Sequence, residues 1–171
     1  IRLLNEPSGL NIGMRKISLS TCGLVPKIYR LAEERLAIVL AISLHAPTNE
    51  LRNRLVPVNK KYPIETLLEA CQYYIDTTGR RITFEYALIE GINDSIEHAK
   101  QLIGILGRIK ANINLIPLNP VDGTGLKRSS GSQIKRFLYV LQQAGIESTF
   151  REEKGSDIEA ACGQLRRRGV E

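Results

Sequence analysis

The chain has 171 residues, of which 43% are apolar, and a formal net charge of +6 at pH 7. This length and composition suffice for one ordinary hydrophobic core and exclude a disordered chain. No run of about 20 apolar residues occurs, and residues 1–16 lack the pattern of a signal peptide. We therefore expect a cytoplasmic protein with no membrane partner.

The positive charge is unevenly distributed along the chain. Residues 1–62 hold ten Lys and Arg against four Asp and Glu, whereas residues 63–120 hold five against seven. A basic surplus fits a polyanion such as RNA, because neutralised phosphates supply most non-specific affinity. Charge alone favours the plainer alternative of a basic soluble surface. The chain has no Trp and 5% aromatic residues, so a stacking platform for single-stranded RNA is not evident.

Short runs rich in Ile, Leu and Val alternate with segments of helical periodicity. We expect strands at residues 15–21, 36–46, 80–90, 111–120 and 145–153. We expect helices at residues 24–34, 63–78, 95–109 and 129–144. The apolar runs are nearly continuous, which predicts parallel strands buried on both faces. Asp94 or Ser95 can cap the start of a helix, and Gly79 and Gly145 follow helix ends.

This repeating order of strands and helices predicts an α/β fold with parallel strands and outer helices. Five strands are too few to close an eight-fold barrel, so a partial (β/α) barrel or a doubly wound sheet is expected. No linker or repeat interrupts the pattern over residues 1–171, which predicts one domain with an open front edge. The abrupt start of the pattern at Ile1 indicates that the chain is a fragment.

Polar residues stand where the predicted strands end: Ser20 in the first, Ser43 and His45 in the second, and Asn119 after the fourth. In parallel α/β sheets, ligand-binding groups gather at the C-terminal ends of the strands. Together these side chains could bind a polar small molecule through hydrogen bonds. Each also has a structural alternative, as a cap, a turn residue or a hydrogen-bonded histidine.

Glu85 lies within the apolar third strand, where a buried carboxylate is costly unless it is paired. Arg81 on the same strand is the candidate partner that would make Glu85 structural. No glycine-rich phosphate loop and no GxGxxG motif occur, which disfavours ATP and NAD chemistry. The glycine-rich, basic segment 121–132 is a candidate lid or substrate contact, and a plain surface loop is an equal alternative.

The three cysteines, Cys22, Cys71 and Cys162, are widely spaced, which predicts reduced thiols and neither a disulfide framework nor a closed metal knuckle. Ser156 and Glu159 form an S-x-x-E capping box, so a helix is expected to start there, with "IEAAC" as its first turns. A helix start and the following basic tail would favour the Cys162 thiolate. A small buried thiol is the equal alternative.

The stretches "LAISLHAPTNELRNRLVPVNKKYPIETLLEA", "INLIPLNP" and "DIEAACGQLR" closely resemble the C-terminal part of the radical-SAM barrel domain in the RlmN/Cfr family. The members of this family are methyltransferases that modify an adenine of large-subunit ribosomal RNA. The resemblance runs over essentially the whole chain. It implies an incomplete (β/α) barrel and a methyl-carrying cysteine at Cys162. The positions implied to contact S-adenosylmethionine (SAM) are Ser20, Ser43, Leu44, His45 and Asn119.

The resemblance also implies a mechanism. Cys162 would take a methyl group from one SAM as a thiolate nucleophile. A second SAM would be cleaved at a 4Fe-4S cluster reduced by an electron donor, and the resulting deoxyadenosyl radical would abstract a hydrogen atom from the S-methyl group. The carbon radical left on the S-methyl group of Cys162 would add to the adenine. Another cysteine would release the RNA by forming a disulfide with Cys162. The adenine must leave its stack, for which the basic front half and segment 121–132 are candidate contacts.

Several family features are absent from this sequence: the CxxxCxxC cluster motif, the resolving cysteine and the N-terminal RNA-binding region. We therefore expect no metal ligands in this chain and no turnover by it alone. Methylation of adenine C2 is the first expectation, with transfer RNA as a second candidate substrate. The alternatives are the C8-methylating Cfr branch, a non-catalytic RNA-binding half-barrel and an unrelated metabolic barrel. No role follows for Cys22, Cys71 or Glu85.

Overall fold

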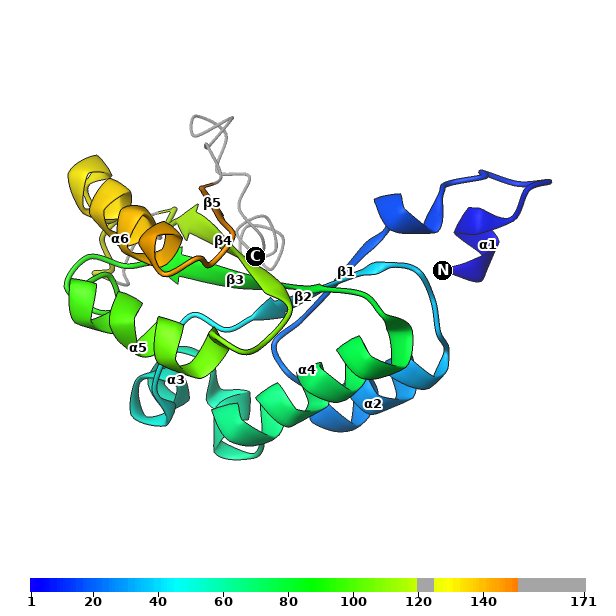
Figure 1. The fold of residues 1–171 in the computed structure, drawn as a ribbon, viewed down its shortest axis with the longest axis horizontal. Coiled ribbons are helices and arrows are strands. Elements are labelled where there is room, and N and C mark those ends of the chain that lie inside the picture. Colours follow the sequence, from blue (N-terminus) through cyan, green and yellow to red (C-terminus); the bar gives the residue numbers. More distant parts are fainter. Residues whose placement is uncertain (120–124, 151–171) are drawn as a thin grey trace, which may run out of the picture.

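The structure, a computed structural model, describes residues 1–119 and 125–150. It contains a five-stranded sheet in the order β1-β2-β3-β4-β5, and all four strand pairs are parallel (Figure 1). The strands are β1 (Ser18–Thr21), β2 (Val39–Ser43), β3 (Ile82–Leu88), β4 (Ala111–Pro117) and β5 (Ser148–Phe150). Each strand therefore pairs with the next one in the sequence, as in a (β/α) barrel, and the predicted α/β fold with parallel strands is confirmed.

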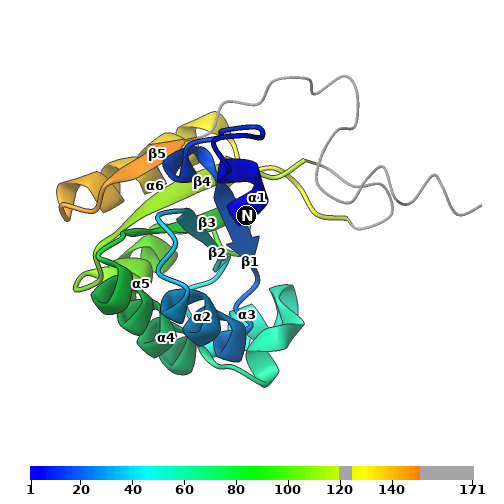
Figure 2. The same cartoon turned by 90° about the vertical axis from the view of Figure 1, so that its right-hand side faces the viewer.

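Four helices connect the strands and cover one face of the sheet (Figures 1 and 2). They are α2 (Val25–Glu33), α4 (Ile64–Thr78), α5 (Ile96–Leu106) and α6 (Gly131–Gln143). All four were expected from the sequence. Ser95 caps α5 by accepting a hydrogen bond from the backbone N–H of His98 at 3.2 Å, and Gly79 ends α4 with a φ of 68° that favours glycine.

Four shorter elements were not expected from the sequence. They are α1 (Arg2–Asn5), η1 (Met14–Lys16), α3 (Asn49–Leu55) and η2 (Pro57–Lys60). Helix α3 is too short to show a clear helical period, although Thr48 caps it by accepting a hydrogen bond from Leu51 N–H at 3.3 Å. It buries both Leu51 and Arg52, and Arg52 matters for the site described below.

The two faces of the sheet differ in burial. In β3, Phe84 and Tyr86 are completely buried against the helices, whereas the intervening Thr83 and Glu85 are half-buried. The expectation of burial on both faces is therefore wrong for β3, because the four connecting helices pack on the face that carries the aromatic residues. Each fully buried aromatic side chain contributes about 2–3 kcal/mol through the apolar area removed from water.

One hydrophobic core lies between the helices and the sheet. It combines side chains from all four connecting helices and from β2, β3 and β4, including Ile28, Leu40, Leu67, Leu102 and Phe137. The opposite, helix-free face is open within the part of the chain that the structure describes. No helix among residues 1–119 and 125–150 is long and apolar enough to cross a membrane.

Candidate functional site

A row of polar side chains crosses the open face, from the end of β2 through the middle of β3 and β4 to β5. Ser43 of β2 lies in register with Glu85 of β3, Glu85 with Asn114 of β4, and Asn114 with Thr149 of β5. Residues in register share a face of the sheet, so these four side chains form one line, here called the polar ladder. Asn114 Nδ2 donates to Glu85 Oε2 at 3.1 Å, and Thr149 Oγ1 donates to Asn114 Oδ1 at 3.4 Å.

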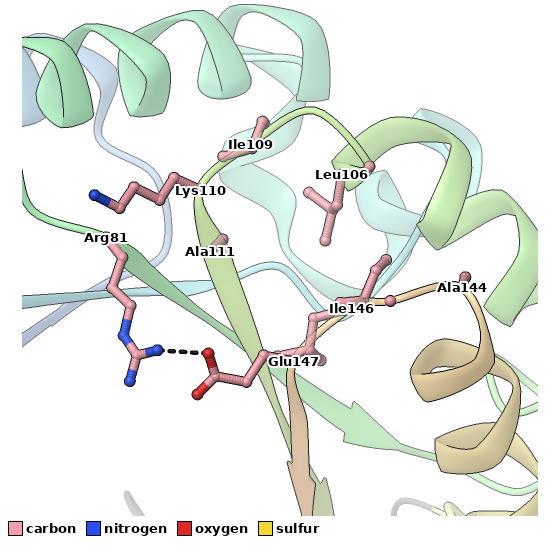
Figure 3. Close-up of a pocket in the computed structure, with 11 residues that line it drawn as sticks. Arg81, Leu106, Ile109, Lys110, Ala111, Ala144, Ile146 and Glu147 are labelled. Atoms are coloured by element: carbon pink, nitrogen blue, oxygen red, sulfur yellow. Dashed lines mark hydrogen bonds and ion pairs between the residues drawn. The ribbon is translucent and has the colours of Figure 1, made fainter.

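Glu85 has no cationic partner among the described residues. Arg81, expected to pair with it, instead forms an ion pair with Glu147, with 2.6 Å between Nη1 and Oε2 (Figure 3). That prediction is wrong because Arg81 stands four residues before Glu85, about 13 Å away along an extended strand. The neutral amide of Asn114 satisfies the Glu85 carboxylate only in part. A half-buried carboxylate with only an amide donor suits a positively charged ligand.

Arg52 of α3 is completely buried and ties two strand ends together. Its Nη2 donates to the carbonyl oxygens of Cys22 at 2.7 Å and Ser43 at 3.1 Å, and its Nε donates to that of Leu44 at 3.0 Å. Its Nη1 donates to Asn59 Oδ1 at 2.9 Å. Burial lowers the pKa of Arg52 from its ordinary value, yet a guanidinium stays charged in proteins. Hydrogen bonds to three backbone carbonyl oxygens and to one side-chain amide oxygen therefore stabilise the positive charge of Arg52.

Asn59 extends this contact to the start of α4. Its Nδ2 donates to Asn53 Oδ1 at 2.8 Å and to Asn49 Oδ1 at 3.0 Å. Asn49 Oδ1 also accepts the backbone N–H of Ile64, the first residue of α4, at 2.8 Å. Arg52, Asn59 and Asn49, here called the arginine clamp, thus hold α3, α4 and the ends of β1 and β2 in one network.

His45 is held in a left-handed conformation, with a φ of 59°. Its Nδ1 accepts the backbone N–H of Ala87 at 3.0 Å, and its carbonyl accepts from Asn93 Nδ2 at 2.8 Å. Burial, and then the charge of Arg52, lower the pKa of His45 to about 4. The ring is therefore neutral at pH 7, and because Nδ1 accepts a hydrogen bond, its proton resides on Nε2.

Asn93 and Asp94 organise the turn that follows β3. Asn93 is completely buried, and besides His45 it donates to the carbonyl of Ala87 at 2.6 Å. Asp94 Oδ2 accepts from Ser129 Oγ at 2.7 Å, just before α6. Two adjacent residues therefore connect the end of β2 with the start of α6.

The structure brings four sequence-predicted residues to the C-terminal edge of the sheet. Ser20 is exposed near the end of β1, Ser43 is the half-buried last residue of β2, and His45 lies two residues beyond it. Asn119 is half-buried just after β4. Parallel strands explain this grouping, because all their carboxyl ends meet at the same edge.

Leu44 differs from the other predicted contacts. Its side chain is completely buried, its N–H donates to the carbonyl of Glu85 at 3.0 Å, and its own carbonyl accepts from Arg52. Leu44 therefore supports the core and the arginine clamp, and its contact with a ligand stays a prediction.

Some predicted residues lie outside the described residues. These are the capping box of Ser156 and Glu159, the candidate nucleophile Cys162, and residues 120–124 at the start of the predicted glycine-rich loop. Within the described ranges, no group of three or more His, Cys, Asp or Glu could hold a metal ion.

Comparisons with known proteins agree with this fold. A domain of pyruvate-formate lyase-activating enzyme from Bacteroides vulgatus superimposes with a TM-score of 0.59 at 17% identity, over 79% of this chain and 80% of that one, which shows a shared fold only. A radical SAM methyltransferase from Sphaerobacter thermophilus superimposes with a TM-score of 0.92 at 50% identity, over 95% of this chain and 48% of that one.

The sequence match is equally extensive. A relative from Thermoanaerobacter pseudethanolicus, named "Probable dual-specificity RNA methyltransferase RlmN", is 55% identical over 168 residues, which make up 98% of this chain and 49% of the relative. The chain is a homologue of RlmN. It spans about half the length of the RlmN proteins that it matches. No protein-family model matches the chain. The resemblance inferred from the sequence motifs is thus confirmed at the level of RlmN and the radical-SAM fold.

Sequence reasoning missed the residues that organise this half of RlmN. Four such residues were not singled out: Arg52 and Asn93, which contact strand ends, Asn59, which contacts Arg52, and Asn114, which contacts Glu85. No local pattern separates a buried arginine from the exposed Arg54 in the same short helix. The turn sequence "EGIND" was the one usable signal, since Asn and Asp commonly bond to nearby backbone.

Proposed function

We propose that this chain forms part of the SAM-binding barrel of a radical-SAM RNA methyltransferase. The observation that carries the proposal is the 55% identity with RlmN over 98% of the chain. We assign the reaction to C2 of an adenine in large-subunit ribosomal RNA, in the cytoplasm, with transfer RNA as a second substrate. Methylation at C8 is the alternative outcome of the same site.

Glu85 of the polar ladder and the residues at the C-terminal edge of the sheet fit SAM. SAM carries a positively charged sulfonium and ammonium, and the Glu85 carboxylate offers opposite charge without an ion-pair partner among the described residues. Ser20, Ser43 and Asn119 offer hydroxyl and amide groups for its polar atoms, and His45 Nε2 can donate a hydrogen bond. When bound, SAM supplies a methyl group attached to a cationic sulfur. The arginine clamp keeps the strand ends that carry Ser43 and His45 in place.

A 4Fe-4S cluster, which the radical-SAM class implies, does not fit the residues of this chain. Such clusters are held by closely spaced cysteine thiolates, and here the three cysteines are far apart. Cys71 is completely buried in the core, and burial raises the pKa of its thiol to about 12. We assign the cluster ligands, and the contact with an electron donor, to the remainder of the RlmN length.

We assign Cys162 the role of methyl carrier. It stands in the "AACGQL" motif of the family resemblance, and Arg166 to Arg168 would favour its thiolate over the thiol. A nucleophilic cysteine of this kind takes a methyl group only as the thiolate, so the basic tail supports the assignment.

Peptide mass spectrometry of the full-length protein, expressed with iron, tests this function. The peptide that contains Cys162 should carry an added methyl group, and nucleoside analysis of the RNA should distinguish methylation at C2 from methylation at C8. Cys162→Ala should abolish methylation of RNA. The matched control Cys22→Ser, at an exposed cysteine, should retain it. An unmodified Cys162 in protein that contains the cluster would contradict the proposal and favour the RNA-binding half-barrel.

A further inference from the structure

Residues 125–146 contain four positively charged residues and no negatively charged one. The net charge of the whole chain is +6. The four cations are Lys127 and Arg128 before α6 and Lys135 and Arg136 within it, and all four side chains are exposed. Tyr139, one turn further along α6, is 62% exposed. These five residues are here called the α6 surface.

The α6 surface is hollowed on both sides of Lys135. One hollow, of about 570 Å³, is lined by Arg128 and Lys135 above the apolar side chains of Leu138 and Phe150. A second, of about 380 Å³, is lined by Lys135, Arg136 and Tyr139. Helix α6 lies at the outside of the molecule beside β4 and β5 (Figures 1 and 2). Cations beside apolar and aromatic groups suit a chain that carries both phosphates and flat bases.

The α6 surface is attached to the C-terminal edge of the sheet by hydrogen bonds. The carbonyl of Lys127 accepts the backbone N–H of Glu90 at 2.9 Å, just beyond β3. Gln133 Nε2 donates to the carbonyl of Asp94 at 2.6 Å, in addition to the bond between Ser129 and the Asp94 carboxylate. Because Asn93, the residue before Asp94, donates to the carbonyl of His45, the α6 surface and the candidate SAM site share one hydrogen-bonded turn.

We propose that the α6 surface is a docking surface for the RNA substrate. Its cations bind backbone phosphates, which position an RNA without reading its sequence, and Tyr139 stacks on an unpaired base. Attachment through Asp94 places the bound RNA at a set position relative to His45 and the strand ends. This inference rests on the proposed function and adds to it the surface that receives the RNA.

The test compares two double charge reversals in the full-length protein. K135E with R136E changes the α6 surface by four charge units. R108E with K110E makes the same change at exposed residues beside the opposite, N-terminal edge of the sheet. Binding of an in-vitro transcript of large-subunit ribosomal RNA is measured by fluorescence anisotropy between 50 and 200 mM salt.

The K135E/R136E protein should bind the transcript at least about 10-fold more weakly than the parent, and the slope of log K against log salt should fall by about 2. The R108E/K110E protein should stay within about 3-fold of the parent. K135R/R136K keeps both charges and should bind like the parent. Tyr139→Ala should weaken binding by at least about 5-fold, and Tyr139→Phe should not.

Equal weakening by both charge reversals would overturn the inference, because it would show a general effect of net charge. Parental affinity in K135E/R136E would overturn it as well. A failure of the proposed function would be seen separately. The parent protein would then lack the methyl group on Cys162 and would leave the transcript unmethylated, whether or not the variants bind RNA. All variants are at exposed side chains, and thermal unfolding followed by circular dichroism confirms that they fold.

Discussion

Arg52 and Cys22 are 30 positions apart in the chain, and Nη2 of Arg52 donates to the carbonyl oxygen of Cys22 at 2.7 Å. The same guanidinium also donates to the carbonyl oxygens of Ser43, the last residue of β2, and of Leu44, which follows it. One side chain from a seven-residue helix therefore joins the ends of two neighbouring strands. The geometry of the candidate SAM site depends on a residue that lies outside the sheet.

Arg52→Lys should reduce both stability and SAM affinity. A lysine ammonium cannot reach all the acceptors of a guanidinium fork, so buried carbonyls lose their partner at a cost of about 2–4 kcal/mol. Displaced strand ends should weaken SAM binding by about 10-fold, which corresponds to about 1.4 kcal/mol. Urea unfolding measures the first effect, and calorimetry with the full-length protein measures the second.

Leu141→Ala is the matched control for Arg52→Lys. Leu141 belongs to α6 and is completely buried, and its truncation should cost about 2–5 kcal/mol of stability. It is not a member of the arginine clamp or of the polar ladder, so SAM affinity should remain at the parental value. If Arg52→Lys also binds SAM like the parent, the arginine clamp is a purely structural feature.

His45 should make stability depend on pH below neutrality. Its pKa of about 4 in the folded protein lies below the ordinary value of 6.5. The folded state therefore favours the neutral ring. The resulting contribution to the free energy of unfolding is fully present above pH 6.5 and is lost as the pH falls from 6.5 towards 4. The full shift corresponds to at most about 3 kcal/mol.

An NMR titration of the histidine ring signals measures this pKa directly. His45→Asn, which tolerates a positive φ, identifies the signal by removing it. The variant should also lose less stability than the parent between pH 7.5 and pH 5, as measured by urea unfolding. A His45 ring that titrates near its ordinary value would contradict the burial seen here.

Gly23→Ala should be more damaging than Gly79→Ala, although both glycines have positive φ. A Cβ on Gly23, at a φ of 103°, would lie 3.1 Å from a Leu67 methyl carbon and 3.4 Å from Arg52 Nη2. We expect a loss of more than about 2 kcal/mol, because strain and overpacking combine.

A Cβ on Gly79 would meet nothing within 4 Å, so Gly79→Ala should cost only about 1 kcal/mol, for the left-handed backbone alone. Urea unfolding of the two variants compares them. Equal losses would show that the space around Gly23 adapts and that only the backbone conformation matters there.

Arg81→Ala and Glu147→Ala should have little effect on stability. The two side chains pair at 2.6 Å but are 54% and 60% exposed, and exposed ion pairs contribute about 0.2–1 kcal/mol. A double-mutant cycle by urea unfolding in 0.5 M salt should give an interaction energy below about 0.5 kcal/mol. A coupling above about 1 kcal/mol would show that the pair links the starts of β3 and β5 across the start of β4.

The sequence by itself determined the order of strands and helices, the parallel sheet and the grouping of Ser20, Ser43, His45 and Asn119 at one edge. These features depend on local periodicity and on a rule that holds for all parallel α/β sheets. Strand boundaries were less certain: the predicted strand at residues 15–21 begins only at Ser18, because Met14–Lys16 form a helical turn.

Only the tertiary structure decided which face of the sheet stays open, that Arg52 is buried, and that Arg81 pairs with Glu147 and leaves Glu85 with the amide of Asn114. The Arg81–Glu147 contact spans 66 positions in the chain, and the contact between Arg52 and Cys22 spans 30. Periodicity reports only neighbours within a few residues. The partner of a charged group is chosen by distance and desolvation after distant segments have come together.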